Sequence, residues 1–152
     1  MLIHLDNRSL LKVSGSDAES FLQAQLSNNI NELDSSSIQL NAYCQHQGKM
    51  FALFWVMRSN DDFLLSFPLD LLEIIKSRLQ MFVIMSDVTI DDVTDEHLQI
   101  GVIDENQNKA FTINDKLSLI ITPSNELEKF SMSSKDNWDK ACFDSSLSEI
   151  YL

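Results

Sequence analysis

The most suggestive reactive side chains in the sequence lie in Cys44-Gln45-His46. Thiolate and imidazole groups are metal ligands, and a cysteine beside a histidine can also act as a covalent nucleophile. Tight metal sites need three or four such groups, and His4 and His97 stand at no regular spacing from this pair. Cys44 and His46 share a face only if a strand continues through position 46, where a turn is expected. We therefore expect no catalytic residue and no metal site here, but a hairpin with a small buried cysteine and an exposed histidine.

Two further groups of residues could bind a cation or a ligand. An acidic run could hold a cation, although runs of this kind more often form a solvated turn; its members are Asp91, Asp92, Asp95 and Glu96. An apolar strand could stack on a flat heterocycle such as a pterin, although at strand spacing its residues more often belong to the core; they are Met50, Phe51, Phe54, Trp55 and Met57. The sequence has no phosphate-binding glycine loop, nucleophile elbow or Cys-x-x-Cys pair.

The composition favours an acidic, globular, cytoplasmic protein. The chain has 152 residues, is 44% hydrophobic and has 11 Lys+Arg against 23 Asp+Glu, a formal net charge of −12. This charge disfavours direct binding of nucleic acid, because such binding depends on cations that displace counterions from phosphates. The longest apolar run, residues 50–57, is far shorter than the roughly 18 residues of a membrane-spanning helix. Asp6 and Arg8 interrupt any secretory signal, and two distant cysteines suit a reducing compartment.

Hydrophobic periodicity predicts an α+β fold. We expect strands over residues 10–13, 38–44, 50–58, 63–67, 88–93, 98–103 and 117–121, the second to fourth of which form an antiparallel meander. A helix over residues 18–26 would begin at a capping box, Ser16 to Glu19, and a second would follow Pro68 with an apolar stripe up to Phe82. Two successive strand–helix–strand groupings are candidates for structural half-repeats.

Three segments, in order, match motifs of one protein family. Residues 13–30, which read VSGSDAESFLQAQLSNNI, resemble the opening motif sGxDaexFLQgQlTnDv of the YgfZ-type folate-binding proteins. Residues 42–50, AYCQHQGKM, resemble the family's hairpin aaxCdxkGkM, and residues 79–90 resemble its helix-to-strand passage LkkyvxrSkVtI. Residues 95–102 continue the likeness, so that the resemblance spans about residues 5–122. The ordered succession is far more specific than any one segment.

The resemblance implies the fold of the glycine-cleavage T-protein, to which the YgfZ-type proteins are related. Residues 1–122 would form a pseudo-twofold α+β domain with antiparallel sheets and packed helices, and residues 123–152 a helix-prone tail that begins a further region. In complete family members this domain packs with others around a folate-binding cavity. The family supports iron–sulfur enzymes and tRNA modification, so one of these enzymes is an expected partner.

The sequence departs from the family pattern in three ways. The family's cysteine motif KGCYxGQE is absent, which indicates the front half of a longer protein. The T-protein has acidic residues just after the hairpin glycine, whereas Gly48 is followed by Lys49, Met50, Phe51, Ala52 and Leu53, so the acid–base group for one-carbon transfer is missing. The pocket tryptophan of enteric members is replaced by Arg8, whose guanidinium could still stack on a pterin or pair with a folate carboxylate.

The resemblance therefore implies a non-catalytic accessory protein with a weak or incomplete tetrahydrofolate site. Carried over position by position, the residues expected at that site are Arg8, Tyr43, Cys44, Gly48, Lys49 and Met50. Two alternatives remain: a folate-dependent aminomethyltransferase, and an interaction module that has lost ligand binding. Apolar side chains of the tail lack an obvious buried face, which predicts a dimer through the last 15 or so residues; they are Trp138, Phe143, Ile150 and Tyr151.

Overall fold

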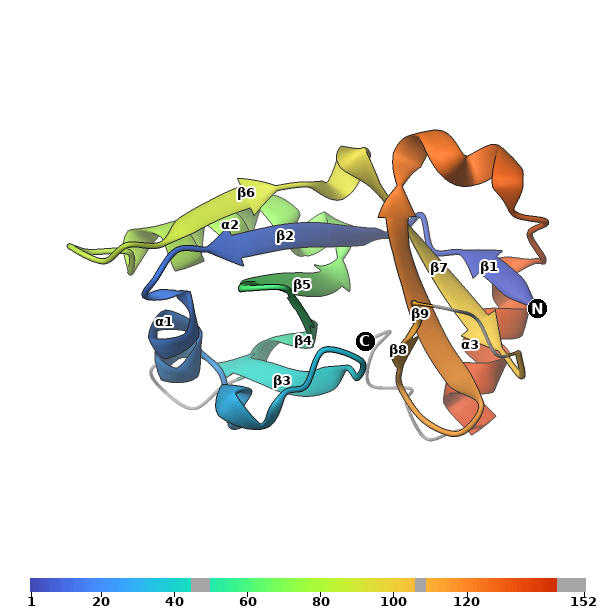
Figure 1. The fold of residues 1–152 in the computed structure, drawn as a ribbon, viewed down its shortest axis with the longest axis horizontal. Coiled ribbons are helices and arrows are strands. Elements are labelled where there is room, and N and C mark those ends of the chain that lie inside the picture. The colour runs from blue at the N-terminus through green and yellow to red at the C-terminus, as the bar shows by residue number, and fades with distance from the viewer. Residues whose placement is uncertain (45–49, 106–108, 145–152) are drawn as a thin grey trace.

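The computed structural model describes residues 1–44, 50–105 and 109–144, with side chains through Cys142, and these residues form two antiparallel sheets (Figure 1). The five-stranded sheet has the order β3-β4-β5-β2-β6, with strands Gln39–Cys44, Met50–Ser59, Asp62–Pro68, Arg8–Ser14 and Thr89–Asp92. The four-stranded sheet has the order β1-β7-β9-β8, with strands Leu2–His4, His97–Ile103, Leu117–Pro123 and Phe111–Thr112. All neighbouring strands within both sheets pair antiparallel. The α+β class and the β3-β4-β5 meander are confirmed.

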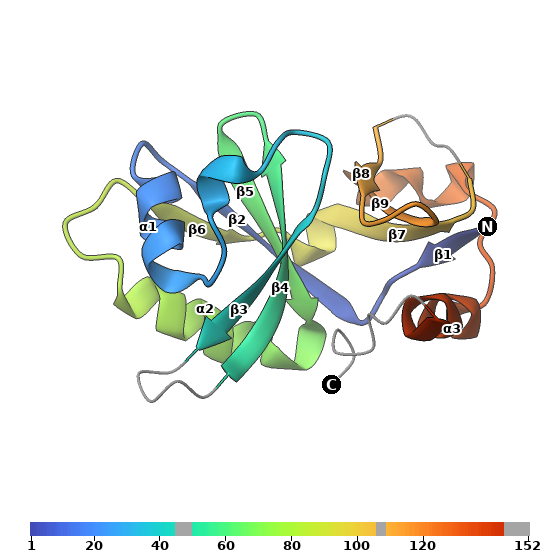
Figure 2. The ribbon, with the colours of Figure 1, turned by 90° about the horizontal axis from the view of Figure 1, so that it is seen from below.

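The helices lie at opposite ends of the molecule (Figure 2). Helices α1 (Ala18–Gln25) and α2 (Leu72–Met81) accompany the five-stranded sheet, while α3 (Lys135–Asp144) packs beside β1 and β7. Short 3₁₀ turns connect the elements at η1 (Ile30–Glu32), η2 (Leu69–Leu71), η3 (Thr94–Glu96) and η4 (Ser124–Lys129). None of the helices in the described ranges is long and apolar enough to cross a membrane.

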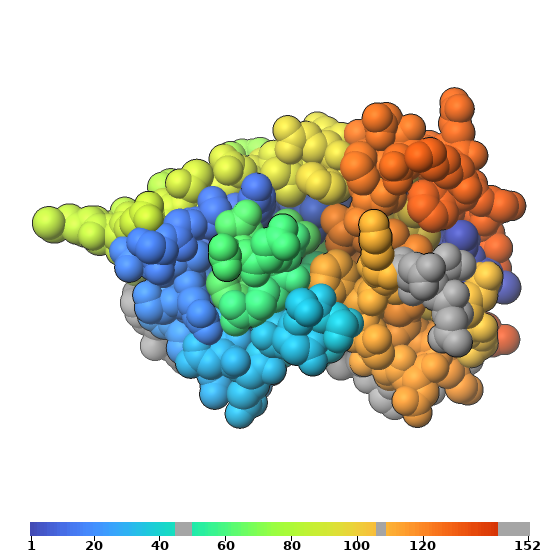
Figure 3. Space-filling model, viewed as in Figure 1, coloured from blue at the N-terminus to red at the C-terminus, as the bar shows by residue number. Residues whose placement is uncertain are grey.

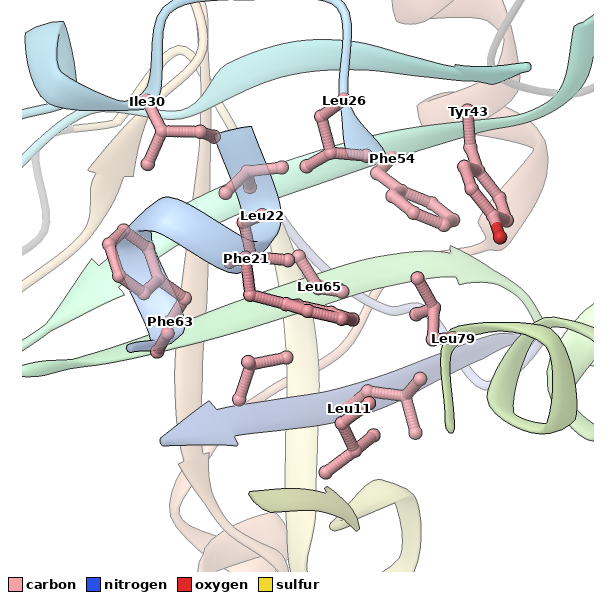
Figure 4. Close-up of a cluster of buried hydrophobic side chains, with 14 of the residues drawn as sticks. Leu11, Phe21, Leu22, Leu26, Ile30, Tyr43, Phe54, Phe63, Leu65 and Leu79 are labelled. Carbon is pink, nitrogen blue, oxygen red and sulfur yellow. The ribbon is translucent and has the colours of Figure 1, made fainter. Parts of the chain in front are cut away.

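The five-stranded sheet is buried on both faces, which explains why its central strands are continuously apolar. On one face, Leu11 and Leu65 join Phe21 and Leu22 of α1 and Leu79 of α2 in the first core cluster (Figure 4). On the other face, side chains one residue out of phase form the second cluster with the four-stranded sheet and α3; those from the five-stranded sheet are Leu10, Trp55, Met57 and Leu64. Because strand side chains alternate, one apolar strand supplies both clusters.

A buried polar network joins the two sheets. Arg8 on β2 donates from Nε to Ser66 Oγ and from Nη2 to the Ser66 carbonyl, both at 2.8 Å. The Ser66 hydroxyl on β5 donates to Gln99 Oε1 on β7, and Gln99 Nε2 donates to the Arg8 and Ser9 carbonyls. The three side chains are at most 4% exposed. The network therefore fixes the crossing point of the two sheets from an almost completely buried position.

Trp138 of α3 packs on a glycine of β7. A Cβ placed on Gly101 would lie 2.4 Å from the Trp138 ring, so only glycine admits the indole here. Trp138 is fully buried and meets Trp55 edge-on, with ring centroids 6.1 Å apart. The expectation that Trp138 lacks a buried face is therefore wrong, because α3 folds back onto the second cluster. The Phe143 side chain, Ile150 and Tyr151 lie outside the described part of the chain.

The N-terminal end of α1 also differs from expectation. Asp17 is the N-cap and accepts no side-chain capping bond, so the predicted capping box is absent. Instead, Ser16 donates from its N–H (2.9 Å) and its hydroxyl (2.8 Å) to Asp87 Oδ2, and the Asp87 N–H donates to Asp17 Oδ2. Gly15 has φ +113°, and a Cβ there would overlap the Asp87 carbonyl oxygen. These contacts tie the turn before α1 to the segment before β6. Strands β1 and β8 were not predicted, because three and two residues carry no periodicity.

We predict that Ser66→Ala lowers the free energy of unfolding by about 1–3 kcal/mol, because Arg8 Nε and Gln99 Oε1 would both lose a buried partner. Chemical denaturation measures the difference. Ser118→Ala on β9 is the matched control, since the described residues give its hydroxyl no hydrogen bond. Equal losses in the two variants would contradict a structural role for the network.

We predict that Gly101→Ala destabilises the protein by about 1–3 kcal/mol through overpacking against Trp138. Trp138→Ala alone is also destabilising, since it empties a core site. In a double-mutant cycle, Gly101→Ala should cost little once Trp138 is alanine. An equal loss of unfolding free energy from Gly101→Ala with and without Trp138 would show that α3 does not pack on Gly101 through this side chain.

The bonds from Ser16 hold the pKa of Asp87 below its usual value of 3.8, the backbone N–H contributing most and the hydroxyl next. In Ser16→Ala the Asp87 pKa should rise toward that value, as measured by NMR titration. Because the folded pKa is the lower one, the stabilisation is present above about pH 5 and is lost as the pH falls through the folded pKa. The stability difference between the native protein and Ser16→Ala should therefore shrink in acid. Ser20→Ala, which removes a hydroxyl bound to a backbone carbonyl, should show no such pH dependence.

Candidate functional site

The hairpin between β3 and β4 contains five of the six predicted site residues. Tyr43 is 3% exposed, and Cys44 ends β3 with its thiol exposed. Met50 begins β4 and is 50% exposed. Gly48 and Lys49 lie outside the described residues. The expectation of a buried cysteine is wrong: the register shifts between Tyr43 and Cys44, at the end of the ladder, and leaves Cys44 at the surface.

The sixth residue, Arg8, lies on the opposite face of the same sheet from Tyr43. The Arg8 guanidinium carbon is 4.1 Å from the ring centre of Trp55, which belongs to the second cluster. Tyr43 stacks on Phe54 in the first cluster, with ring centroids 5.7 Å apart. The predicted site residues therefore lie on opposite faces of the five-stranded sheet. A single ligand cannot contact both groups, because the sheet lies between them.

A cavity of about 260 Å³ opens beside Arg8, at the joint between the two sheets. Its polar lining includes His4 of β1, His97 of β7, and Asp95 of η3, with Arg8 and Gln99 at its buried side. Cation, imidazole and carboxylate groups together suit a small polar or zwitterionic group more than an apolar one. Sequence spacing gave no sign of the two histidines, because they come to line one cavity only through the pairing of the distant strands β1 and β7.

The other place is an aromatic corner formed by Tyr43, Phe51, Phe54 and Arg78. Tyr43 meets Phe51 edge-on at 6.2 Å, and the Arg78 guanidinium carbon lies 5.2 Å from the Phe51 ring centre. Phe51 is only partly buried, whereas Phe54 is fully buried. Of the five residues considered for pterin stacking, only Met50 and Phe51 are thus accessible; the others form core. Arg78 was not predicted to lie at this site, because no sequence pattern shows which helix residue packs against β4.

The chemistry of the hairpin strand is apolar. β4 reads MFALFWVMRS and has no carboxylate along its length. Among the described residues, no group of three or more His, Cys, Asp or Glu side chains is arranged to hold a metal ion. In the acidic run, Asp91 and Asp92 are exposed on β6, and Asp92 Oδ1 accepts a hydrogen bond from the Thr94 N–H.

Comparison with known proteins identifies relatives over part of their length. No protein-family model matches the chain. An uncharacterized protein of Haemophilus influenzae is 32% identical over 125 residues, which are 78% of this chain and 44% of that protein. The tRNA-modifying proteins YgfZ of Enterobacter sp. (strain 638) and Vibrio atlanticus are 32% and 26% identical, over 66% and 68% of this chain and 31% of each relative. The chain thus spans less than half the length of these relatives.

A solved structure shares the fold. The glycine cleavage system aminomethyltransferase T from Bartonella henselae superposes with a TM-score of 0.67 at 12% sequence identity, covering 95% of this chain and 45% of that one. At this identity the likeness establishes the fold alone. The antiparallel sheets of that fold and the ordered sequence matches to YgfZ agree with one another. This chain is therefore a YgfZ-type protein with the aminomethyltransferase fold, matched over part of its relatives' length.

Proposed function

We propose that the chain is a folate-binding accessory protein of the YgfZ type that does not itself transfer one-carbon groups. The observation that carries the proposal is the composition of β4: the strand that follows the family's hairpin is Met50, Phe51, Ala52 and Leu53 where an acid–base carboxylate is expected. An apolar strand with an aromatic corner can bind a flat heterocycle, but it cannot move a proton during one-carbon transfer.

Of the two places, the hairpin is the one that would contribute to folate binding. At the hairpin, Phe51 and Met50 offer partly exposed apolar surface for a pterin. Arg8 is at the other place, where its guanidinium already serves the joint between the sheets. The partner that such a protein serves would be an iron–sulfur or tRNA-modifying enzyme, in keeping with the tRNA-modifying role in the names of the YgfZ relatives.

An exposed apolar tip favours a second candidate, an interaction module. Residues between α2 and β6 project at one end of the molecule (Figure 3), and Met81, Ile84 and Met85 are 63%, 69% and 104% exposed. The bonds between Asp87 and the turn before α1 hold this tip in place. If docking is the main function, Ile84→Ser with Met85→Ser should change light scattering in mixtures with a partner and leave folate binding untouched.

We predict that the purified chain binds tetrahydrofolate with a dissociation constant weaker than about 1 μM, equivalent to about −8 kcal/mol, and shows no aminomethyl transfer. Calorimetry measures the binding. The transfer assay uses a glycine-cleavage aminomethyltransferase as the positive control and a reaction without protein as the blank. Turnover above the blank would contradict the non-catalytic proposal, and no detectable binding at millimolar tetrahydrofolate would contradict folate binding.

A further inference from the structure

We propose that Tyr43 and Arg78 together bind a carboxylate group of a ligand at the aromatic corner around Phe51. Tyr43 comes from β3 and Arg78 from the last turn of α2, and the two residues come to adjoin one ring, Phe51, only in the folded protein. Neither residue takes part in the network of Arg8, Ser66 and Gln99 or in the bonds between Asp87 and the turn before α1. The proposal rests on three observations about hydrogen bonding, charge and position.

The first observation is an unused buried hydroxyl. Tyr43 is 3% exposed, and its Oη is buried without a hydrogen-bond partner among the described residues. Figure 4 shows the ring beside Phe54 at the edge of the first cluster. A buried hydroxyl that lacks a partner costs about 1–3 kcal/mol relative to a satisfied one. Phenylalanine would fill the same space without that cost, so the hydroxyl requires an explanation.

The second observation is an unused donor on a cation. Arg78 Nε is also buried without a hydrogen-bond partner, and no carboxylate within the described ranges forms an ion pair with Arg78. By contrast, Arg58, which likewise stacks on a phenylalanine, donates to Glu19 and to the carbonyls of Ile30 and Leu33. Arg58 is thus bonded within the fold through Nε and Nη2, whereas Nε of Arg78 is buried without a partner.

The third observation is that both groups adjoin the same ring. Tyr43 touches the edge of Phe51, and the Arg78 guanidinium stands over Phe51. Phe51 is partly exposed, so a ligand would reach the two buried polar atoms by displacing or moving past this ring.

The chemistry of the two groups selects the ligand. Arg78 Nε–H can only donate and Tyr43 Oη–H can also donate, so a hydrogen-bond acceptor is the partner that suits both groups. A water molecule would satisfy the donors but not the positive charge, and a metal cation would be repelled by it. A carboxylate satisfies both the donors and the charge, and a planar guanidinium is the group that pairs best with it.

The carboxylate site does not depend on the proposed function. If the chain does bind folate, the site would identify where a folate carboxylate binds. The glutamate part of a folate has carboxylates, and a simple carboxylic acid would supply the same group. Binding of the two kinds of compound must therefore be measured separately.

The test uses benzoate as the carboxylate probe and benzamide as its neutral analogue, each titrated into the native chain and followed by NMR of the aromatic side chains. We expect benzoate to bind in the millimolar range and to shift the Tyr43 and Phe51 ring signals, while benzamide binds at least 5-fold more weakly. Arg78→Gln should weaken benzoate binding at least 5-fold, and Tyr43→Phe should weaken it about 3-fold without lowering thermal stability. Lys76→Gln, which removes the same charge from the same helix, should leave binding unchanged.

Equal affinity for benzoate and benzamide, or an equal loss of benzoate binding in Arg78→Gln and Lys76→Gln, would overturn the proposal. A stability loss in Tyr43→Phe would also overturn it, because it would show that the hydroxyl is already satisfied. Titration with tetrahydrofolate separates the two proposals. Folate binding that is insensitive to Arg78→Gln rejects this site and keeps the proposed function, whereas benzoate binding without folate binding keeps the site and rejects the proposed function.

Discussion

The arrangement of the molecule depends on one buried polar contact, the bonds among Arg8, Ser66 and Gln99 where the two sheets meet. Burying a guanidinium is unfavourable unless its donors are satisfied and its charge is stabilised. Here the Ser66 hydroxyl and carbonyl accept two of the hydrogen bonds, and the Trp55 ring faces the charge. Because each member satisfies another, a shift of either sheet would leave several buried polar groups without partners. The network thus permits one relative position of the sheets, which apolar packing alone would not select.

The second core cluster is built around that position. The Trp55 ring contacts both the Arg8 guanidinium and Trp138. The buried polar network and the packing of α3 therefore depend on the same side chain. Gly101 lets the helix approach β7 closely enough for Trp138 to fill the space between the sheets. The α3 segment is consequently part of this domain's core rather than a separate appendage, and it closes the cluster at the side away from α1 and α2.

The same architecture determines what the candidate site can be. The five-stranded sheet is covered on both faces, so its side chains face two different surroundings, and residues that are close in sequence are separated by the sheet itself. Arg8 serves one face and Tyr43 the other. A ligand at the hairpin therefore meets Phe51, Tyr43 and Arg78, while a ligand beside Arg8 meets His4 and His97. The likeness to YgfZ and to aminomethyltransferase T concerns the scaffold that makes both places.

The sequence alone determined the elements with strong periodicity: the meander of β3, β4 and β5, helix α2, and strands β7 and β9, because alternating or continuous apolar runs depend on local geometry. It also determined the family, through motifs in a fixed order. Tertiary structure decided the rest. The bonds of Ser16 to Asp87 replaced the expected capping box, since a partner 71 residues away cannot be read from local spacing. Trp138 is buried because Gly101 lies opposite it, and Arg78 adjoins Phe51 because α2 packs on that face of the sheet. Contacts between distant segments are set by packing and satisfied hydrogen bonds, which a one-dimensional pattern does not contain.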